Sequence, residues 1–218
     1  MIFKPNSTIV CVGDSITDCG RVRPLGEGRD AKMGTSYVAH VNALLRVNYP
    51  DLRLRMINMG VSGNTSTQLL ERWDSDVLAL KPDWVTVLIG INDVWRQFEI
   101  PQIKHIHVYI DEYKENLQEM VRRTLPQTKN IILMSPFFME LNKDDPMRVM
   151  MDAYSAAMRE VAEEFGIMFV DIQKGFDEYM SHGHHAMSIA WDRVHPDMTG
   201  HTIILRELLN AVGFEWKR

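Results

Sequence analysis

The sequence predicts an α/β protein, a three-layer α/β/α sandwich with a five-stranded parallel sheet in the middle. Short apolar runs alternate along the chain with segments of helical periodicity, a pattern typical of strands joined through helices. The strongest run, residues 84–89, shows little polar alternation, as expected of a strand covered on both faces. Strands connected in this way pair in parallel through right-handed crossovers.

The first strand is the run Val10-Cys11-Val12, which ends in a tight turn at Gly13-Asp14-Ser15. Four further runs predict strands at residues 52–58, 84–89, 130–134 and 167–170. Apolar residues at helical spacing predict helices over residues 35–49, 67–80, 111–125, 147–165, 172–181 and 199–212. Pro50 and Pro126 directly follow two of these helices and Pro82 lies two residues beyond a third, at positions where a helix rarely continues.

The bulk composition limits the class of protein. A chain of 218 residues with 45% hydrophobic residues predicts one domain spanning residues 1–218. The formal net charge of -5 argues against nucleic acid or an anionic membrane as a partner. We see no secretory leader and no apolar run near the ~20 residues of a membrane span. Only Cys11 and Cys19 are present, without a disulfide framework, which favours a reducing, cytoplasmic location.

Polar loops follow the first three predicted strands. In an open parallel sheet the functional site lies at the carboxyl ends of the strands. Gly13-Asp14-Ser15, residues 60–65 and residues 90–93 stand directly after those ends, and 90–93 is predicted to be a turn. Residues 20–30 form another predicted loop, glycine- and arginine-rich, on the surface beside Ser15.

These loops can supply the groups that acyl transfer needs. Ser15 is the candidate nucleophile, His195 its base and Asp192 the carboxylate that orients the histidine. We expect the backbone N–H groups of Ser15 and Gly63 and the side-chain amide of Asn92 to bind the oxyanion. The order Ser, Asp, His matches that of α/β-hydrolases, but their Gly-x-Ser-x-Gly elbow is missing, so a different scaffold is predicted.

Four blocks of the sequence resemble the SGNH hydrolases, also called GDSL esterases. They are Gly13-Asp14-Ser15, Ser62-Gly63-Asn64-Thr65, Gly90-Ile91-Asn92-Asp93, and residues 192–195. Longer stretches at 13–21, 89–96 and 190–196 resemble the intracellular bacterial acetylxylan esterases of that family. The resemblance implies a flavodoxin-like fold, deacetylation of xylo-oligosaccharides and assembly as a homo-oligomer. The stretch His182-Gly183-His184-His185 departs from the family pattern.

Four residues in or beside the catalytic blocks are candidates for substrate binding: Asp14, Trp95, Arg96 and Trp191. Asp14 is more typical of a turn residue, and the two tryptophans could equally stack on sugar or pack the loops.

The histidines of the 182–185 stretch could suggest zinc, but a glycine-containing run at a helix end is typical of a solvated loop. We predict no metal and no cofactor.

The candidate residues predict a serine esterase that acts through an acyl-serine intermediate. The resemblance implies that it removes O-acetyl groups from small acetylated carbohydrates, with xylo-oligosaccharides as the expected substrates. Two alternatives stay open. One is a general short-chain esterase, lipase or thioesterase, which the polar loop at 20–30 disfavours. The other is a carbohydrate-binding relative without catalysis, which the complete set of candidate residues disfavours.

Overall fold

The computed structural model describes residues 1–29 and 32–216, so Asp30, the last residue of the predicted 20–30 loop, lies outside the described residues. Within them, a parallel sheet is built from β1 (Thr8–Gly13), β2 (Arg55–Asn58), β3 (Trp84–Leu88), β4 (Ile131–Met134) and β5 (Met168–Val170). The strand order is β2-β1-β3-β4-β5, and every neighbouring pair is parallel. This is the flavodoxin-like order, and the predicted fold class is confirmed.

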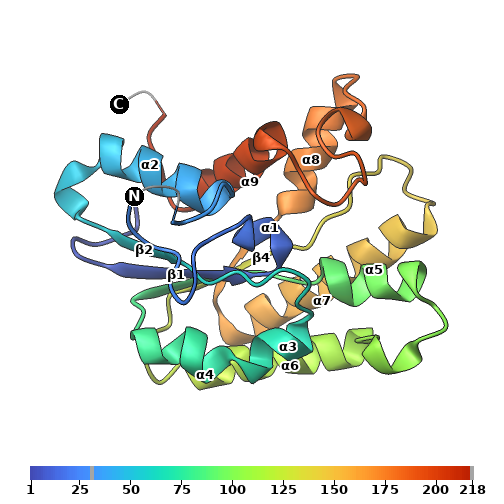
Figure 1. The fold of residues 1–218 in the computed structure, drawn as a ribbon, viewed down its shortest axis with the longest axis horizontal. Helices are drawn as coiled ribbons and strands as arrows, with labels where there is room; N and C mark the ends of the chain where they lie inside the picture. Colours follow the sequence, from blue (N-terminus) through green and yellow to red (C-terminus); the bar gives the residue numbers. More distant parts are fainter. Residues whose placement is uncertain (30–31, 217–218) are drawn as a thin grey trace.

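Helices cover both faces of the sheet (Figure 1). On one side lie α2 (Tyr37–Asn48), α8 (Ile172–Ser181) and α9 (Met198–Ala211), with α9 in contact with the other two. On the other lie α3 (Ser66–Glu71), α4 (Trp73–Asp76), α5 (Ile91–Glu99), α6 (Ile110–Thr124) and α7 (Pro146–Phe165). Short 3-10 turns occupy Pro50–Leu52, Leu78–Leu80, Lys104–Ile106 and Ala186–Ser188.

The centre of the sheet is closed to solvent on both faces. All residues from Ile9 to Val12 in β1 are fully buried, which explains why the strand reads as a continuous apolar run. At its carboxyl end Gly13 pairs with Leu88 of β3, and a Cβ on Gly13 would collide with the Leu88 carbonyl oxygen. Glycine therefore lets β1 and β3 stay in contact up to the residue before Asp14. The chain turns from these two strands to opposite faces, so their carboxyl ends form the topological switch point.

The predicted helix over 67–80 is wrong as a single element. It divides into α3 and α4 at Arg72, and a 3-10 turn follows. The Arg72 guanidinium donates to the carbonyl oxygens of Met59 (2.7 Å) and Gly13 (3.0 Å). Trp73 is buried, and its ring N–H bonds to Thr124. Arg72 has a φ of -98° and a ψ of 9°, outside the helical region, and its bonds to these distant carbonyl groups hold the chain at the break between α3 and α4.

The predicted turn at 90–93 is also wrong, because α5 begins at Ile91. Its first turn buries two polar residues, Asn92 and Asp93, and therefore lacks the apolar periodicity by which a helix is recognised. The strand predicted at 52–58 starts only at Arg55, after the 3-10 turn at Pro50–Leu52. No helix in the described part of the chain combines the length and apolar character needed to cross a bilayer.

Candidate active site

Ser15 is the first residue of a four-residue helix, α1 (Ser15–Asp18), at the carboxyl end of β1. Asp14 caps this helix, since its Oδ1 accepts a hydrogen bond of 2.9 Å from the backbone N–H of Ile16. The predicted tight turn is thus a strand that passes into a helix within one residue. It places the Ser15 backbone N–H at a helix N-terminus, a position that favours negative charge.

The structure brings Ser15, His195 and Asp192 together. Ser15 Oγ lies 2.9 Å from His195 Nε2, and His195 Nδ1 lies 2.6 Å from Asp192 Oδ2. With a proton on Nδ1 donated to Asp192, Nε2 accepts the hydrogen of the serine hydroxyl. These three side chains have the arrangement that activates a serine for nucleophilic attack.

A tight turn delivers the base and its carboxylate together. Asp192 Oδ1 accepts hydrogen bonds from the backbone N–H groups of Val194 (2.9 Å) and His195 (2.8 Å). Arg193 between them has a φ of 64°, in the left-handed region, and is held by an ion pair of 2.7 Å to Glu140. The carboxylate is therefore fixed by its own backbone before it contacts the imidazole.

The ionised form of Asp192 is favoured by these contacts. Burial alone would raise the pKa of Asp192, but the hydrogen bonds from the His195 ring and from the backbone of His195 and Val194 outweigh it, so the pKa lies below its usual value. Asp192 stays charged at neutral pH and can stabilise a protonated His195 during reaction.

Besides Ser15, the candidate oxyanion donors are Gly63, in the loop before α3, and Asn92, at the start of α5. Gly63 has a φ of 82°, a conformation that residues with a Cβ rarely adopt. Asn92 lies in the first turn of α5, where its Nδ2 donates a 2.9 Å hydrogen bond to the carbonyl oxygen of Asn64. This bond holds the Asn92 amide against the loop that carries Gly63 and leaves its second N–H available.

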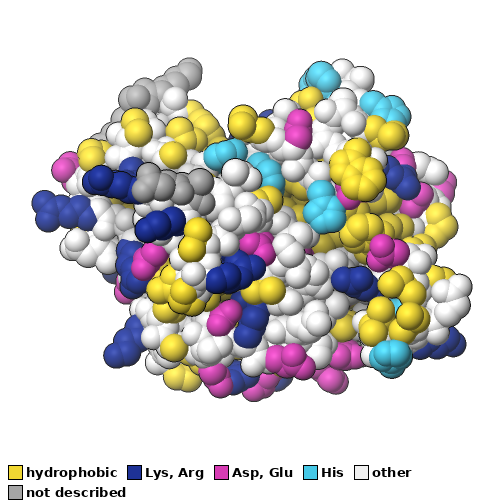
Figure 2. All heavy atoms as spheres, in the orientation of Figure 1, with side chains coloured by type: hydrophobic (Ala, Val, Ile, Leu, Met, Phe, Trp, Pro, Cys, Tyr) yellow, Lys and Arg dark blue, Asp and Glu magenta, His cyan; other side chains and the backbone are white. Residues whose placement is uncertain are grey.

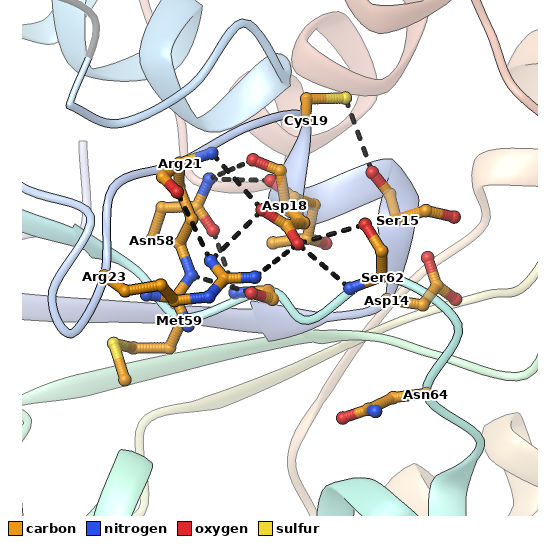
Figure 3. Close-up of polar contacts among 12 residues, drawn as sticks. Asp14, Ser15, Asp18, Cys19, Arg21, Arg23, Asn58, Met59, Ser62 and Asn64 are labelled. Atoms are coloured by element: carbon orange, nitrogen blue, oxygen red, sulfur yellow. Dashed lines mark hydrogen bonds and ion pairs between the residues drawn. The ribbon is translucent and has the colours of Figure 1, made fainter.

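The structure reveals an organising residue that the sequence did not single out, Asp18 (Figure 3). Its Oδ2 accepts hydrogen bonds of 3.0 Å from both the backbone N–H and the hydroxyl of Ser62, and it pairs with Arg23 at 2.6 Å. Burial would raise the pKa of Asp18, but the bonds from Arg23 and Ser62 outweigh it and lower the pKa. The carboxylate thus ties the helix of Ser15 to the residue before Gly63.

The expectation of a surface loop at 20–30 is wrong for Arg21, which is only 6% exposed. Its Nε donates to the carbonyl oxygen of Gly60 at 2.7 Å, and its Nη1 donates to that of Pro24 at 2.7 Å. Asn58, at the end of β2, makes two further hydrogen bonds. Its Nδ2 donates to the carbonyl oxygen of Thr17 at 2.6 Å, and its Oδ1 accepts from the Gly60 N–H at 2.9 Å. Two sequence signals could have pointed to these residues: Arg21 lies in a glycine-rich segment, and Asn58 ends an apolar strand.

Asp14 is misplaced as a candidate substrate-binding residue, because it is only 1% exposed. Burial, and to a lesser extent the charge of Asp93, raises the pKa of Asp14 to about 7. Burial likewise raises the pKa of Asp93 to about 6, although Ser66 donates to that carboxylate. Both acids lie beneath the loops of the site and cannot touch a substrate from there.

The other three substrate-binding candidates differ in environment. The Trp95 ring packs edge-on against the ring of His195, the candidate base, with centroids 5.7 Å apart. Trp191 is 79% exposed next to Asp192, and Arg96 lines a pocket beside Gly63. Figure 2 shows histidine and hydrophobic side chains gathered on this face, above the helix labelled α5 in Figure 1.

The histidines of the 182–185 stretch have separate partners. His182 bonds to the Glu178 carbonyl oxygen, His184 stacks on Tyr179, and His185 accepts from the Met187 N–H. Across residues 1–29 and 32–216, no group of three His, Cys, Asp or Glu side chains is arranged to hold a metal ion.

Comparison with known proteins adds a family and several relatives. The model of the GDSL-like lipase/acylhydrolase family matches residues 11–203. An acetylxylan esterase of Geobacillus stearothermophilus is 51% identical over 210 residues, covering 96% of this chain and 95% of that protein. An acetylxylan esterase of Xylanibacter ruminicola is 25% identical over 199 residues, which span 75% of this chain and 35% of that protein.

Similar solved structures also include acetylxylan esterases. The crystal structure of Axe2, an acetylxylan esterase from Geobacillus stearothermophilus, superposes with a TM-score of 0.98 at 49% identity, covering 100% of this chain and 99% of that one. Similar structures include catalytic mutants of Axe2 in which a serine, an aspartate or a histidine is replaced by alanine. LAE5, an alpha/beta hydrolase enzyme from the metagenome of Lake Arreo, Spain, has a TM-score of 0.95 at 48% identity, covering 98% of both chains.

Proposed function

The chain belongs to the GDSL-like lipase/acylhydrolase family, and from that premise we propose that it is a serine esterase that removes O-acetyl groups from small acetylated carbohydrates, with xylo-oligosaccharides as its substrates. The observation that carries the proposal is the pair of hydrogen-bond distances, 2.9 Å from Ser15 Oγ to His195 Nε2 and 2.6 Å from His195 Nδ1 to Asp192 Oδ2.

The proposed reaction has two displacements. Ser15 Oγ attacks the acetyl carbonyl carbon and its proton passes to His195 Nε2. The tetrahedral intermediate places its negative oxygen on the N–H groups of Ser15 and Gly63 and on the Asn92 amide. When it collapses, His195 returns the proton to the sugar oxygen, which leaves as an alcohol.

Water completes the cycle. His195 takes a proton from a water molecule that attacks the acetyl-serine carbonyl, and acetic acid leaves as the proton returns to Ser15 Oγ, then ionises to acetate in solvent. Asp192 remains ionised throughout, consistent with its lowered pKa. These side chains and backbone donors account for every proton transfer, so the proposed reaction needs no metal or cofactor.

The relatives support the choice of substrate. The 51% identical protein is an acetylxylan esterase, and serine, aspartate and histidine are the residue types changed in the catalytic mutants of Axe2. The exposed indole of Trp191, next to Asp192, suits the face of a sugar ring.

The test is hydrolysis by the purified protein of acetylated xylo-oligosaccharides and of aryl esters with acetyl, propionyl and butyryl groups. We expect activity on the acetylated sugars and a fall from acetyl to butyryl. Efficiency that rises with acyl length would favour the lipase or thioesterase alternative, since a lipid site gains ~0.8 kcal/mol per buried methylene.

The Ser15→Ala variant tests the nucleophile itself. It should lose a factor on the order of 10⁴ to 10⁶ in turnover, and His195→Ala should be similarly severe. Activity of the Ser15→Ala protein equal to that of the unchanged protein would overturn the assignment of Ser15 as nucleophile, whereas no hydrolysis by the unchanged protein would favour a binding protein.

We further infer that the protein forms one domain over residues 1–218, acts in the cytoplasm and assembles as a homo-oligomer. The location is supported by Cys11 and Cys19, which are both free thiols. Assembly is supported by large apolar side chains left in solvent, namely Met187, Met198 and Trp216. Light scattering at the 25.2 kDa of a single chain would contradict assembly.

A further inference from the structure

A polar pocket of about 370 Å³ opens beside the oxyanion loop. Its wall includes Gly63, Thr67, Gln68, Arg96 and Glu112. The volume falls in the range of about 300–1,000 Å³ that holds small organic ligands in proteins. Since Gly63 belongs both to this wall and to the proposed oxyanion site, a substrate bound for reaction lies at the edge of the pocket.

Arg96 offers unused hydrogen-bond donors there. A Cβ on Gly63 would lie 3.6 Å from Arg96 Nη2, which places the guanidinium against the backbone of the oxyanion loop. Among the described residues Arg96 pairs with Glu99, at 3.6 Å, and the Arg96 side chain is 31% exposed. A planar guanidinium with free N–H groups is suited to bind two neighbouring oxygens.

Glu112 supplies an oriented acceptor in the same pocket. The Thr67 hydroxyl donates to Glu112 Oε1 at 2.7 Å, and Asn116 Nδ2 donates to Thr67 Oγ1 at 2.9 Å. This chain holds the carboxylate in place and leaves Oε2 for a ligand. Gln68 is fixed similarly, because its Oε1 accepts from the Thr65 N–H at 3.0 Å while its NH₂ group stays exposed.

We propose that this pocket is a subsite for a second, unacetylated sugar unit of the substrate, bound through its hydroxyl groups by Arg96, Glu112 and Gln68. The inference rests on the proposed function and extends it to the length of the substrate. An acetyl group ends after one methyl, so only the sugar side of the ester can extend into a pocket of this size.

The charges in the pocket select a neutral, hydroxylated ligand. Arg96 and Glu112 carry opposite charges, so a uronic acid attracted by Arg96 would meet the Glu112 carboxylate in the same space. A neutral pyranose presents hydroxyl groups that both donate and accept, which matches the guanidinium, the amide and the carboxylate together. An acyl chain would instead leave these three groups without partners, at a cost in free energy.

Steady-state kinetics with three substrates tests the subsite. The substrates are an aryl acetate, methyl xyloside with one acetyl group, and xylobiose with the same acetyl group on one unit. For the unchanged protein we expect a lower KM for the disaccharide than for the monosaccharide. Arg96→Met and Glu112→Gln should each shrink that KM ratio roughly tenfold, because the first removes charged donors and the second removes the charge that strengthens the hydrogen bond to the sugar.

Two matched variants serve as controls. Arg122→Met changes an arginine with a similar glutamate contact, 3.7 Å to Glu119, on the surface of α6. Glu115→Gln changes an exposed carboxylate of that same helix. Both should keep the KM ratio of the unchanged protein.

The outcomes separate the subsite from the function. Hydrolysis of both acetylated sugars with equal KM, or equal losses on all three substrates in the Arg96 and Glu112 variants, overturns the subsite and leaves the esterase function standing. Hydrolysis of the aryl acetate alone overturns the carbohydrate function as well. A KM ratio that favours the disaccharide and falls only in the two pocket variants establishes the second sugar unit.

Discussion

Asp18 and Ser62 are joined by two hydrogen bonds of 3.0 Å that end on the same carboxylate oxygen. Asp18 is the last residue of the helix that begins with Ser15, and Ser62 directly precedes Gly63. A buried carboxylate, whose charge is balanced by Arg23, therefore links the proposed nucleophile to the oxyanion loop directly, in addition to the contacts made by Asn58 and Arg72.

Weakening this link should affect turnover more than substrate affinity. In Ser62→Ala the hydroxyl bond is lost while the backbone bond remains, and in Asp18→Asn the charge is lost with little change in shape. We expect kcat for an aryl acetate to fall several-fold in Ser62→Ala and by about tenfold or more in Asp18→Asn, with KM little changed, because oxyanion contacts strengthen in the transition state.

Ser75→Ala is the matched control for that pair. The Ser75 hydroxyl also donates to an aspartate, Asp76, at 2.8 Å, but on the exposed surface of α4. A loss of thermal stability in Asp18→Asn with kcat and KM both unchanged would mean that the link only supports the fold.

Replacing Asn92 by alanine should lower turnover. One oxyanion donor is typically worth ~10² to 10³ in kcat, or ~2.7 to 4 kcal/mol. KM should change little, since the ground-state carbonyl is bound less strongly than the oxyanion. Weaker binding with kcat intact would instead identify Asn92 as a residue that only positions the substrate, and a melting curve checks that the lost bond to Asn64 has not unfolded the loop.

The free energy of unfolding should depend on pH through Asp14. Burial raises its pKa to about 7 in the folded protein, so the folded state holds this proton more tightly than the unfolded state does. The free energy of unfolding therefore falls as pH rises from about 4 through about 7, and the loss is complete above that. Asp14→Asn cannot ionise, and its oxygen can still cap Ile16.

Urea denaturation of both proteins at about pH 5 and about pH 8 measures the effect. The free energy of unfolding of Asp14→Asn minus that of the unchanged protein should be larger at about pH 8 than at about pH 5, by a few kcal/mol. Asp93 is present in both proteins, and Asp51→Asn provides an exposed control. If this difference in the free energy of unfolding were the same at both pH values, Asp14 would ionise as readily in the folded state as in the unfolded state.

Trp191→Ala should separate stacking on sugar from support of the neighbouring loop. The indole is 79% exposed, so its removal leaves little packing unfilled. We expect a larger loss of kcat/KM on acetylated xylose derivatives than on an aryl acetate. Equal losses on both substrates would mean that Trp191 acts by holding Asp192 and His195 in place.

The sequence predicted the sheet and the clustering of site residues because both follow from local patterns plus one topological rule. Apolar runs such as residues 84–89 specify strands, and parallel pairing brings the loops after them to one edge. Helix ends at Pro126 or at the Gly166 cap follow from backbone geometry.

Buried polar residues account for the elements and site residues that the sequence did not predict. Asn92 and Asp93 are polar but buried, so the first turn of α5 lacks the apolar pattern of a helix. Arg72 lies at the break between α3 and α4, where it bonds to carbonyl groups distant in the sequence. Asp18 and Arg21 have the composition of a solvated loop, yet their partners are far along the chain, at Ser62 and Gly60. Such contacts have no periodicity, so no local pattern reveals them.

The hydrogen bond between Ser15 and His195 joins residues 180 positions apart. During refolding, such a contact closes only after the intervening strands and helices have found their order, because loop closure over long separations is slow. Recovery of esterase activity therefore reports the completion of the whole sheet rather than the formation of its helices. During synthesis on the ribosome, the nucleophile emerges early and stays inert until the segment around residue 195 has left the exit tunnel and docked.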